Sequence, residues 1–380
     1  MSRPLSPLIL SSACLLTLLV PGAAAQSSPA TPGLDGFITA QMAAGHLPGL
    51  EAVIVKNGRI VWDGAYGLAD IGRQRPVTPD TLFQLASVSK TVTATALMQL
   101  FDLGAFGLDD DVSGALSFPV VHPNFATTPI TFRHLLTHTA GFEDNWSVMA
   151  YTVGNSPWPL GWFCEQYIVP GGRLSDPNDN WIPFQPGTHY SYSNFGFALN
   201  GHLVESLSKM DFEDYCQANL FQPLGMQETS WRLAKLDPTH IAHPYGWTGS
   251  GYVDYGFYGY PDYPDGCLRT SARQLASFML AHMAQGTYGG YAMLLPGTPG
   301  LMTQVQLPTV EASQGLAFYW KTIQGQPVVG HNGGDQGVQT EFWMRPWDGQ
   351  TGVILLTNGD SGNQAVTRIV ERLFREAILY

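Results

Sequence analysis

The strongest constraint on the fold is a pair of hairpin-like segments at opposite ends of the 380-residue chain. Near the amino end, LEAVIVKNGRIVWDGAYG reads as two strands joined at Asn57-Gly58, a dipeptide that suits a type I′ hairpin turn. Near the carboxyl end, TEFWMR and TGVILLTN flank the turn PWDGQ and form a second antiparallel ribbon. We therefore expect one sheet that is built from both ends of the chain.

Helical segments complete the predicted architecture. LDGFITAQMAAG predicts a short helix before the first ribbon, and NQAVTRIVERLFREAI predicts a closing helix after the second. The middle of the chain contains RHLLTHTAG and the helix FGFALNGHLVESLSK. The predicted fold class is α/β (α+β), with an antiparallel sheet flanked by helices over residues 26–103 and 265–380. A mostly helical domain is inserted at residues 104–264, and its aromatic stretch YVDYGFYGYPDYPDG is interpreted either as the lining of a substrate cleft or as a surface loop.

The first residues have the pattern of an export signal. Arg3 precedes the apolar run LILSSACLLTLLV and the small-residue segment PGAAAQ, which predicts a cleavable signal at residues 1–25. The run is short for a bilayer span, so an uncleaved anchor is the alternative and no span is expected after cleavage. We expect an exported protein, periplasmic or secreted.

Charge and cysteine content restrict the function further. A formal net charge of −12 and a pI near 5.1 repel nucleic acid and favour a small-molecule or peptide substrate. Without the signal, Cys164, Cys216 and Cys267 remain, which allows one disulfide of unassigned pairing and leaves at least one thiol unpaired. No C-x-x-C spacing indicates a structural zinc or redox site.

Two S-x-x-K segments raise the question of a nucleophilic serine. Ser87 opens an apolar helix that precedes Gly104, and a helix N-terminus stabilises an oxyanion formed beside it. Lys90 follows on the same helical face, and burial is expected to lower its pKa so that the amine serves as a base. Ser206 instead falls in the last turn of a helix, where the dipole disfavours an oxyanion and Lys209 complements it, so we interpret this copy as structural.

A third segment, FQPGTHYSYSNFG, supplies Tyr192 and Asn194 in a loop just before a helix. A phenol can carry a proton, and an amide can hold a substrate carbonyl or N–H. A Y-x-N triplet alone is weak evidence, because loop tyrosines usually serve packing. Its order after the serine–lysine pair makes the combination specific.

With these segments the sequence resembles the serine β-lactamase and penicillin-binding protein superfamily, which includes class C β-lactamases, D-alanyl-D-alanine carboxypeptidases, D-aminopeptidases and related esterases. The resemblance covers nearly all of the chain beyond the predicted signal. The segments that carry it are LPGLEAVIVKNGRIVWDGAYGLAD, FQLASVSK, ITFRHLLTHTAGF, FQPGTHYSYSNFG, LFQPLGMQETSW, GCLRTSARQLASFM and VVGHNGGDQGV. It implies an α/β domain joined to a helical domain, with the active site in the cleft between them.

The resemblance also implies residue roles. Ser87 is the nucleophile, Lys90 assists acylation, Tyr192 shuttles protons and activates the deacylating water, and Asn194 contacts a substrate amide. No metal or organic cofactor is implied.

The third element of the family departs from the β-lactamase pattern. Where β-lactamases carry K-T-G, this chain has His331-Asn332-Gly333 on a strand-like segment. A lysine there attracts a substrate carboxylate, whereas histidine is mostly neutral near pH 7 unless a neighbour raises its pKa. This change puts efficient β-lactam hydrolysis in doubt. Gly334 falls where the family's second oxyanion-hole N–H lies, and it permits close approach of a carbonyl.

Two further patterns are interpreted as structural. His134 and His138 have the spacing of two metal ligands on a helix, but the glutamate of H-E-x-x-H and a third ligand are missing. GDSG at residues 359–362 lacks the sequence context of a trypsin-like nucleophile. No G-x-S-x-G elbow is present.

The sequence thus predicts a serine hydrolase that cleaves an amide or ester through an acyl-enzyme, most closely a D-amino-acid peptidase of the D-alanyl-D-alanine carboxypeptidase type. A class C-like β-lactamase and a carboxylesterase are the alternatives within hydrolases. A catalytically silent penicillin-binding sensor is the alternative outside the enzymes. Repeated release of product distinguishes a hydrolase from such a sensor.

Overall fold

The computed structural model describes residues 33–347 and 350–380. The predicted signal at residues 1–25 therefore lies outside the described residues. In the described part of the chain, no helix is both long and apolar enough to cross a bilayer.

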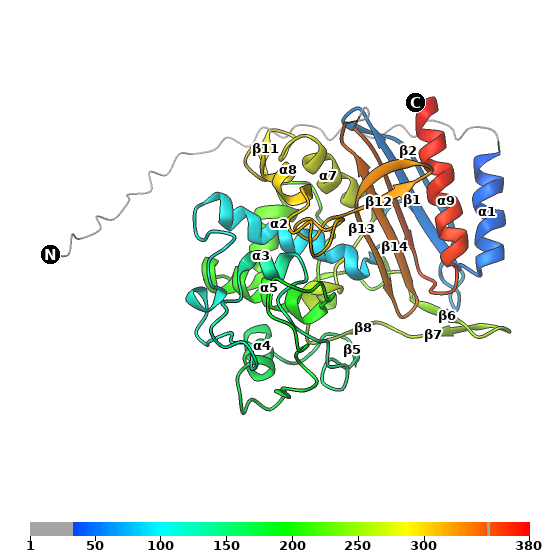
Figure 1. Cartoon of the computed structure of the whole chain (residues 1–380). Coiled ribbons are helices and arrows are strands. Elements are labelled where there is room, and N and C mark those ends of the chain that lie inside the picture. Colours follow the sequence, from blue (N-terminus) through cyan, green and yellow to red (C-terminus); the bar gives the residue numbers. More distant parts are fainter. Residues whose placement is uncertain (1–32, 348–349) are drawn as a thin grey trace, which may run out of the picture.

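One large antiparallel sheet contains strands from both ends of the chain, as predicted (Figure 1). Its strands within the described residues are β1 (Gly49–Lys56), β2 (Arg59–Asp70), β3 (Arg75–Pro76), β12 (Tyr319–Ile323), β13 (Gln326–Asp335), β14 (Val338–Arg345) and β15 (Thr351–Thr357). The strand order is β12-β13-β14-β15-β1-β2-β3, so the first and last strands of the chain pair in its centre. Asn57 and Gly58 both have positive φ, 49° and 77°, as a type I′ turn requires.

Helices cover both faces of the sheet. Helices α1 (Leu34–Gly45) and α9 (Asn363–Glu376) lie side by side on one face (Figure 1). The face of α9 that packs inward carries apolar residues three and four apart: Ala365, Val366, Ile369, Val370, Leu373 and Phe374. On the other face, α7 (Ala272–Met283) contacts β1 and β15. Both predicted terminal helices are thus confirmed.

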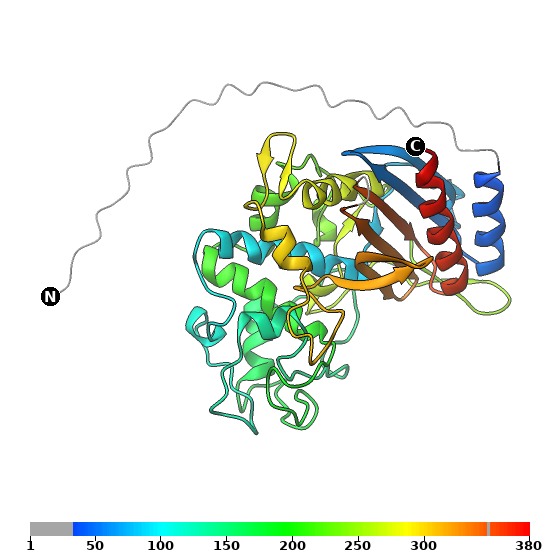
Figure 2. The same ribbon diagram turned by 45° about the horizontal axis from the view of Figure 1, so that its top comes forward.

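The helical region packs beside the sheet and around α2 and α5 (Figure 2). Its helices are α2 (Ser89–Asp102), α3 (Phe132–Leu136), α4 (Leu160–Ile168), α5 (Asn194–Ser208) and α6 (Phe212–Cys216), and α8 (Thr298–Thr303) follows α7. Short strands connect the rest: β4 (Phe83–Gln84), β5 (Thr152–Val153), β6 (Tyr245–Trp247), β7 (Tyr252–Asp254), β8 (Tyr258–Gly259), β9 (Arg269–Thr270), β10 (Thr287–Tyr288) and β11 (Tyr291–Ala292). Helix α2 packs on α5. The predicted domain boundaries at residues 104 and 265 stay a prediction.

The three cysteines among the described residues are all free and buried. Cys164 lies in α4, Cys216 ends α6, and Cys267 precedes β9. The disulfide that the sequence allowed is therefore not formed. Burial raises the pKa of the Cys164 and Cys216 thiols well above the ordinary value, which keeps them protonated.

The two halves of the aromatic stretch lie in different environments. Tyr252 and Tyr255 are exposed, and the first of them lies on the short β6–β7 hairpin. Tyr258 and Tyr260 are buried, and the following turn, Tyr263–Asp265, packs against α2 and α5. The second half of the stretch therefore reaches the interior beside the predicted nucleophile.

Candidate active site

Ser87 lies in a short 3-10 turn, Ala86–Val88, directly before α2. The structure thus places the serine immediately ahead of the α-helix, with the helix itself starting at Ser89. Ala86 has a φ of 46°, which is unusual for a residue with a Cβ, so the backbone in front of Ser87 is strained. Gly104, with a φ of 75°, follows the end of α2 as predicted.

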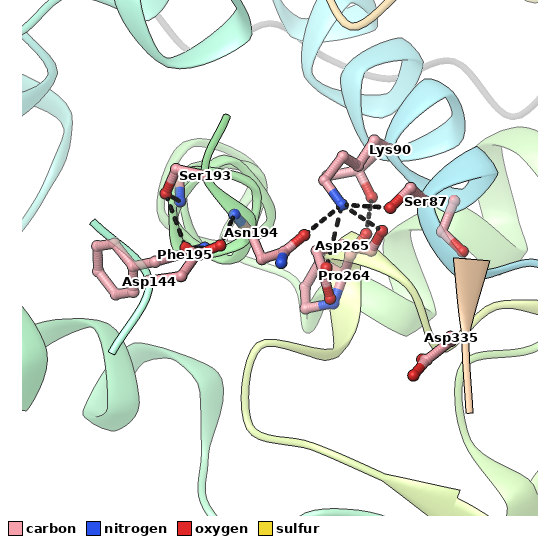
Figure 3. Close-up of polar contacts among 12 residues, drawn as sticks. Ser87, Lys90, Asp144, Ser193, Asn194, Phe195, Pro264, Asp265 and Asp335 are labelled. Carbon is pink, nitrogen blue, oxygen red and sulfur yellow. Dashed lines mark hydrogen bonds and ion pairs between the residues drawn. The ribbon is translucent and has the colours of Figure 1, made fainter. Parts of the chain in front are cut away.

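Lys90 is completely buried and lies at the centre of the site (Figure 3). Its Nζ is 3.1 Å from Ser87 Oγ and donates to Asn194 Oδ1 at 2.7 Å. It also lies 3.0 Å from Asp265 Oδ2 and donates to the Asp265 backbone carbonyl at 3.1 Å. The ammonium therefore joins the nucleophile turn to α5 and to the loop that ends at Asp265.

The expectation that burial lowers the pKa of Lys90 is wrong. Burial does act in that direction, but the Asp265 carboxylate and Tyr192 outweigh it and hold the pKa of Lys90 above its ordinary value. Burial in turn raises the pKa of Asp265 to about 6, although Lys90 opposes the shift. Lys90 is therefore an ammonium in the resting site, and it cannot serve there as the neutral base.

Tyr192 lies between Lys90 and His138. The Lys90 Nζ is 4.9 Å from the centroid of its ring, and the His138 ring stacks on it at 4.3 Å between centroids. Burial raises the pKa of the Tyr192 phenol, whereas Lys90 and the Ser87 hydroxyl lower it by stabilising the ionised form. The net pKa of Tyr192 lies above its ordinary value, so the resting group is the neutral phenol, and Lys90 stabilises the anion that forms from it.

Asn194 is the first residue of α5, and its position is fixed by the start of that helix. The Ser193 hydroxyl caps the helix by accepting from Gly196 N at 3.1 Å. Asp144 accepts from Asn194 N at 2.9 Å and from Phe195 N at 3.0 Å, as Figure 3 shows. A carboxylate at this N-terminus matches the helix dipole and holds the Asn194 side chain against Lys90.

Strand β13 brings the third predicted segment next to Ser87. A Cβ at Gly333 would lie 2.9 Å from Ser87 N and 2.4 Å from the Leu85 carbonyl oxygen, so this position has room only for glycine. A Cβ at Gly334 would meet no atom within 4 Å and would point into the cleft. The tight approach to the nucleophile turn is therefore made at Gly333, while Gly334 leaves space for a substrate.

His331 is buried on the same strand, with its ring 6.3 Å from that of Tyr192 and 5.2 Å from that of Tyr319. Burial lowers the pKa of His331 to about 3, and the positive charge of Lys90 adds to the shift. The histidine is thus neutral over the physiological range. It does not supply the positive charge that lysine gives at the corresponding place in β-lactamases.

Buried histidines predict a specific loss of stability in acid. Burial holds the pKa of His282 and His331 at about 3 and that of His138 well below its ordinary value. In the unfolded chain these histidines become protonated below about pH 6.5, whereas in the folded protein they stay neutral. The stability that the folded protein gains from this difference in pKa is therefore highest above about pH 6.5, and it is lost as the pH falls towards the pKa values of the folded state. We expect His282→Gln to reduce the acid slope of the unfolding free energy by up to about 1.4 kcal/mol per pH unit, measured by urea unfolding from pH 8 to 4. An unchanged slope would contradict the burial argument.

Two cavities meet at Ser87, Tyr192 and Gly334, which line both. The first has a volume of about 380 Å³ and is lined by Ala86, Ser87, Glu143, Asp144, Trp146, Met149, Tyr151, Tyr192, Asn194, Tyr260, Asp262, Asp265, Gly334 and Asp335. The second has a volume of about 410 Å³ and is lined by Ser87, Tyr190, Tyr192, Glu311, Ser313, Gln314, Tyr319, His331, Asn332 and Gly334. Among these described lining residues there is no lysine or arginine.

The structure thus brings all seven predicted site residues to one cleft region, and it adds two that sequence reasoning missed. Asp265 pairs with Lys90, and His138 supports Tyr192 while its Nδ1 accepts from Ser193 N at 3.1 Å. The H-x-x-x-H spacing had drawn attention to His138 only as a metal ligand. His134 Nδ1 instead accepts from Thr131 N in the cap of α3.

The serines interpreted as structural lie in other environments. Ser206 is in the last turn of α5 and donates to the Ala115 carbonyl. Lys209 is the cap residue of that helix, in the left-handed conformation. Ser361 donates to the Gly45 carbonyl at 3.0 Å, at the end of α1.

An antiparallel sheet flanked by helices, with a helical region beside it and a Ser-x-x-Lys turn at their junction, is the β-lactamase/transpeptidase fold. A sequence model of the Beta-lactamase family matches residues 34–375, and the chain belongs to this family. It is 25% identical over 347 residues to the protein flp of Staphylococcus aureus (strain N315), covering 90% of this chain but only 65% of that relative's length.

Solved structures agree in fold. The D-amino acid amidase from Ochrobactrum anthropi SV3, complexed with L-phenylalanine, superposes with a TM-score of 0.73 at 22% identity, covering 91% of this chain and 98% of the other. A penicillin-binding protein from Bacillus halodurans superposes with a TM-score of 0.69 at 25% identity, covering 89% and 99%.

Proposed function

We propose that the protein is a serine hydrolase that cleaves an amide or ester bond through a covalent Ser87 ester. The observation that carries this proposal is the contact of Ser87 Oγ with a buried ammonium at 3.1 Å, beside a phenol and at the meeting point of two cavities. Membership of the β-lactamase family and the similarity in fold to a D-amino acid amidase support it.

In the proposed mechanism the ionised fraction of Tyr192, which Lys90 and the Ser87 hydroxyl stabilise against the burial that raises the pKa of this phenol, takes the proton of Ser87 Oγ. Ser87 Oγ then attacks the substrate carbonyl carbon, and the carbonyl oxygen becomes an oxyanion held by the N–H groups of Ser87 and Gly334. Tyr192 passes its proton to the leaving group as the acyl bond breaks. A water molecule, deprotonated by Tyr192, releases the acid in the second half of the cycle.

The charges around the cleft favour some of the candidate substrates over others. A carboxypeptidase or a β-lactamase binds a substrate carboxylate, and the neutral His331 with the nearby Glu311 offers it no positive charge. Amides and esters of D-amino acids without that carboxylate fit better. We therefore propose an amidase, aminopeptidase or esterase type of activity ahead of a β-lactamase or D-alanyl-D-alanine carboxypeptidase.

A substrate panel tests this function. The chain is incubated with a nitrophenyl ester, D- and L-alanine nitroanilides, a D-alanyl-D-alanine peptide and a chromogenic cephalosporin, and release of product is followed. We expect repeated turnover of the ester or an alanine anilide, with slower turnover of both carboxylate-bearing substrates. Intact-mass measurement should detect an acyl adduct on Ser87. A stable adduct without turnover would favour the silent sensor, and neither adduct nor turnover would refute the proposal.

A further inference from the structure

The first cavity beside Ser87 is unusually rich in carboxyl groups. Its lining includes Glu143, Asp144, Asp262, Asp265 and Asp335. Lys90 pairs with one of them, Asp265, at 3.0 Å. The cavity therefore contains more carboxyl groups than Lys90 can pair with.

Three of these carboxyl groups have partners within the protein. Asp144 binds the N-terminus of α5, and Asp265 binds Lys90. Asp335 accepts from the Tyr151 hydroxyl at 2.6 Å and from the Tyr260 hydroxyl at 3.1 Å. Their positions are thus fixed by the fold itself.

Asp262 differs from them because its carboxyl group is buried without a matching donor. The residue is only 3% exposed, and its Oδ1 has no hydrogen-bond partner. Burial and the neighbouring Asp265 and Asp144 carboxyls raise the pKa of Asp262 well above its ordinary value. A buried carboxyl of this kind lowers stability unless a donor or cation reaches it, and here it forms part of a cavity wall.

The same cavity also has an apolar and aromatic side. Trp146 is 61% exposed, and Met149, Tyr151 and Tyr260 share the lining with the carboxyl groups. Aromatic faces attract organic cations as well as apolar side chains. In the described part of the chain, no group of three or more His, Cys, Asp or Glu residues is arranged to hold a metal ion. The chemistry of the wall therefore matches an organic ammonium with an apolar substituent.

We propose that this cavity binds a free ammonium group of the substrate close to the scissile carbonyl, with Asp262 as the residue that determines specificity. The inference rests on the proposed hydrolase function and names its substrate class: amides, esters or short peptides of amino acids with an unblocked amino group and an apolar side chain. Because Ser87 and Asn194 line the same cavity, the ammonium and the reacting carbonyl belong to one residue or to adjacent ones.

Matched substrate pairs test the proposal on the unaltered protein. Nitroanilides and nitrophenyl esters of D- and L-phenylalanine are compared with their N-acetyl counterparts, which are neutral but otherwise alike. We expect kcat/KM to favour the free-amine member by about 30-fold or more, as for a charge pair away from water. Equal or better turnover of the N-acetyl member would overturn the proposal.

A variant pair assigns the effect to one carboxyl group. Asp262→Asn should reduce the preference for the free amine by about tenfold or more, mainly through KM. Asp80→Asn removes an exposed carboxyl that lines neither cavity, and it should leave the preference unchanged. An unchanged preference in a folded Asp262→Asn protein would overturn the role of Asp262.

The two proposals fail in different ways. If neutral esters are turned over through Ser87 but the free amine gives no advantage, the ammonium site is refuted and the hydrolase stands. If no substrate is turned over and no acyl adduct forms, the hydrolase itself is refuted, and the ammonium site with it.

Discussion

Ser87→Ala is expected to lower ester and amide hydrolysis by about 10⁴-fold or more, because the acyl-enzyme cannot form. The acyl adduct seen by mass measurement should disappear with it. Ser87 is half-buried and small, so thermal unfolding should change little. Steady-state kinetics and intact-mass measurement on the same preparation check both expectations.

Ser206→Ala provides the matched control, because it removes the serine of the second S-x-x-K segment. The Ser206 hydroxyl donates to the Ala115 carbonyl, so its loss should lower the free energy of unfolding by about 1 kcal/mol. Hydrolysis should stay within about twofold of the unaltered protein, since this change lies in the last turn of α5, away from both cavities. Equal loss of activity in the two variants would contradict the assignment of Ser87.

Asp265→Asn should have the largest effect on stability. The change leaves the Lys90 ammonium buried without its counter-charge, which costs about 3–5 kcal/mol when one partner of a buried ion pair is removed. It also removes the main influence that raises the pKa of Lys90, so burial should dominate and that pKa should fall. Urea unfolding at pH 7 measures the loss.

Two further variants separate the ion pair from general damage. The double change Lys90→Met with Asp265→Leu should recover much of the lost stability, because a buried pair replaced by apolar groups leaves no unpaired charge. It should stay inactive. Asp109→Asn breaks an exposed pair with Arg133 and should cost under about 1 kcal/mol. If Asp265→Asn costs no more than Asp109→Asn, Asp265 does not stabilise Lys90.

Local patterns in the sequence were sufficient for the sheet and for the nucleophile segment. Hairpin turns such as Asn57-Gly58, and the change from an extended segment to an apolar helix around Ser87, depend on neighbouring residues and can be predicted from them. The resemblance then ordered Tyr192, Asn194 and His331 along the chain. In the structure these three residues line the cavities beside Ser87. Their catalytic roles stay predictions.

The charge state of Lys90 could not be predicted in the same way. Its counter-ion, Asp265, lies 175 positions away, in a loop whose sequence has no periodic pattern. Burial alone pointed to a lowered pKa, and only the position of that carboxylate reverses the sign. Asp262 lies in the same loop, and the burial of its unpartnered Oδ1 could not be predicted for the same reason. Electrostatics in a cleft depends on long-range contacts that local sequence patterns do not encode.

The central pairing of β1 with β15 affects how this chain acquires its structure. These strands join residues near 50 to residues near 357, as in the pairing of Leu50 with Thr357, so the middle of the sheet is closed only by the last strand to leave the ribosome (Figure 1). A growing chain can form α2 and the helices around it earlier, but one edge of β1 stays without its neighbour until synthesis is almost finished. Such long-range closure slows folding and exposes an apolar strand edge to aggregation in the meantime.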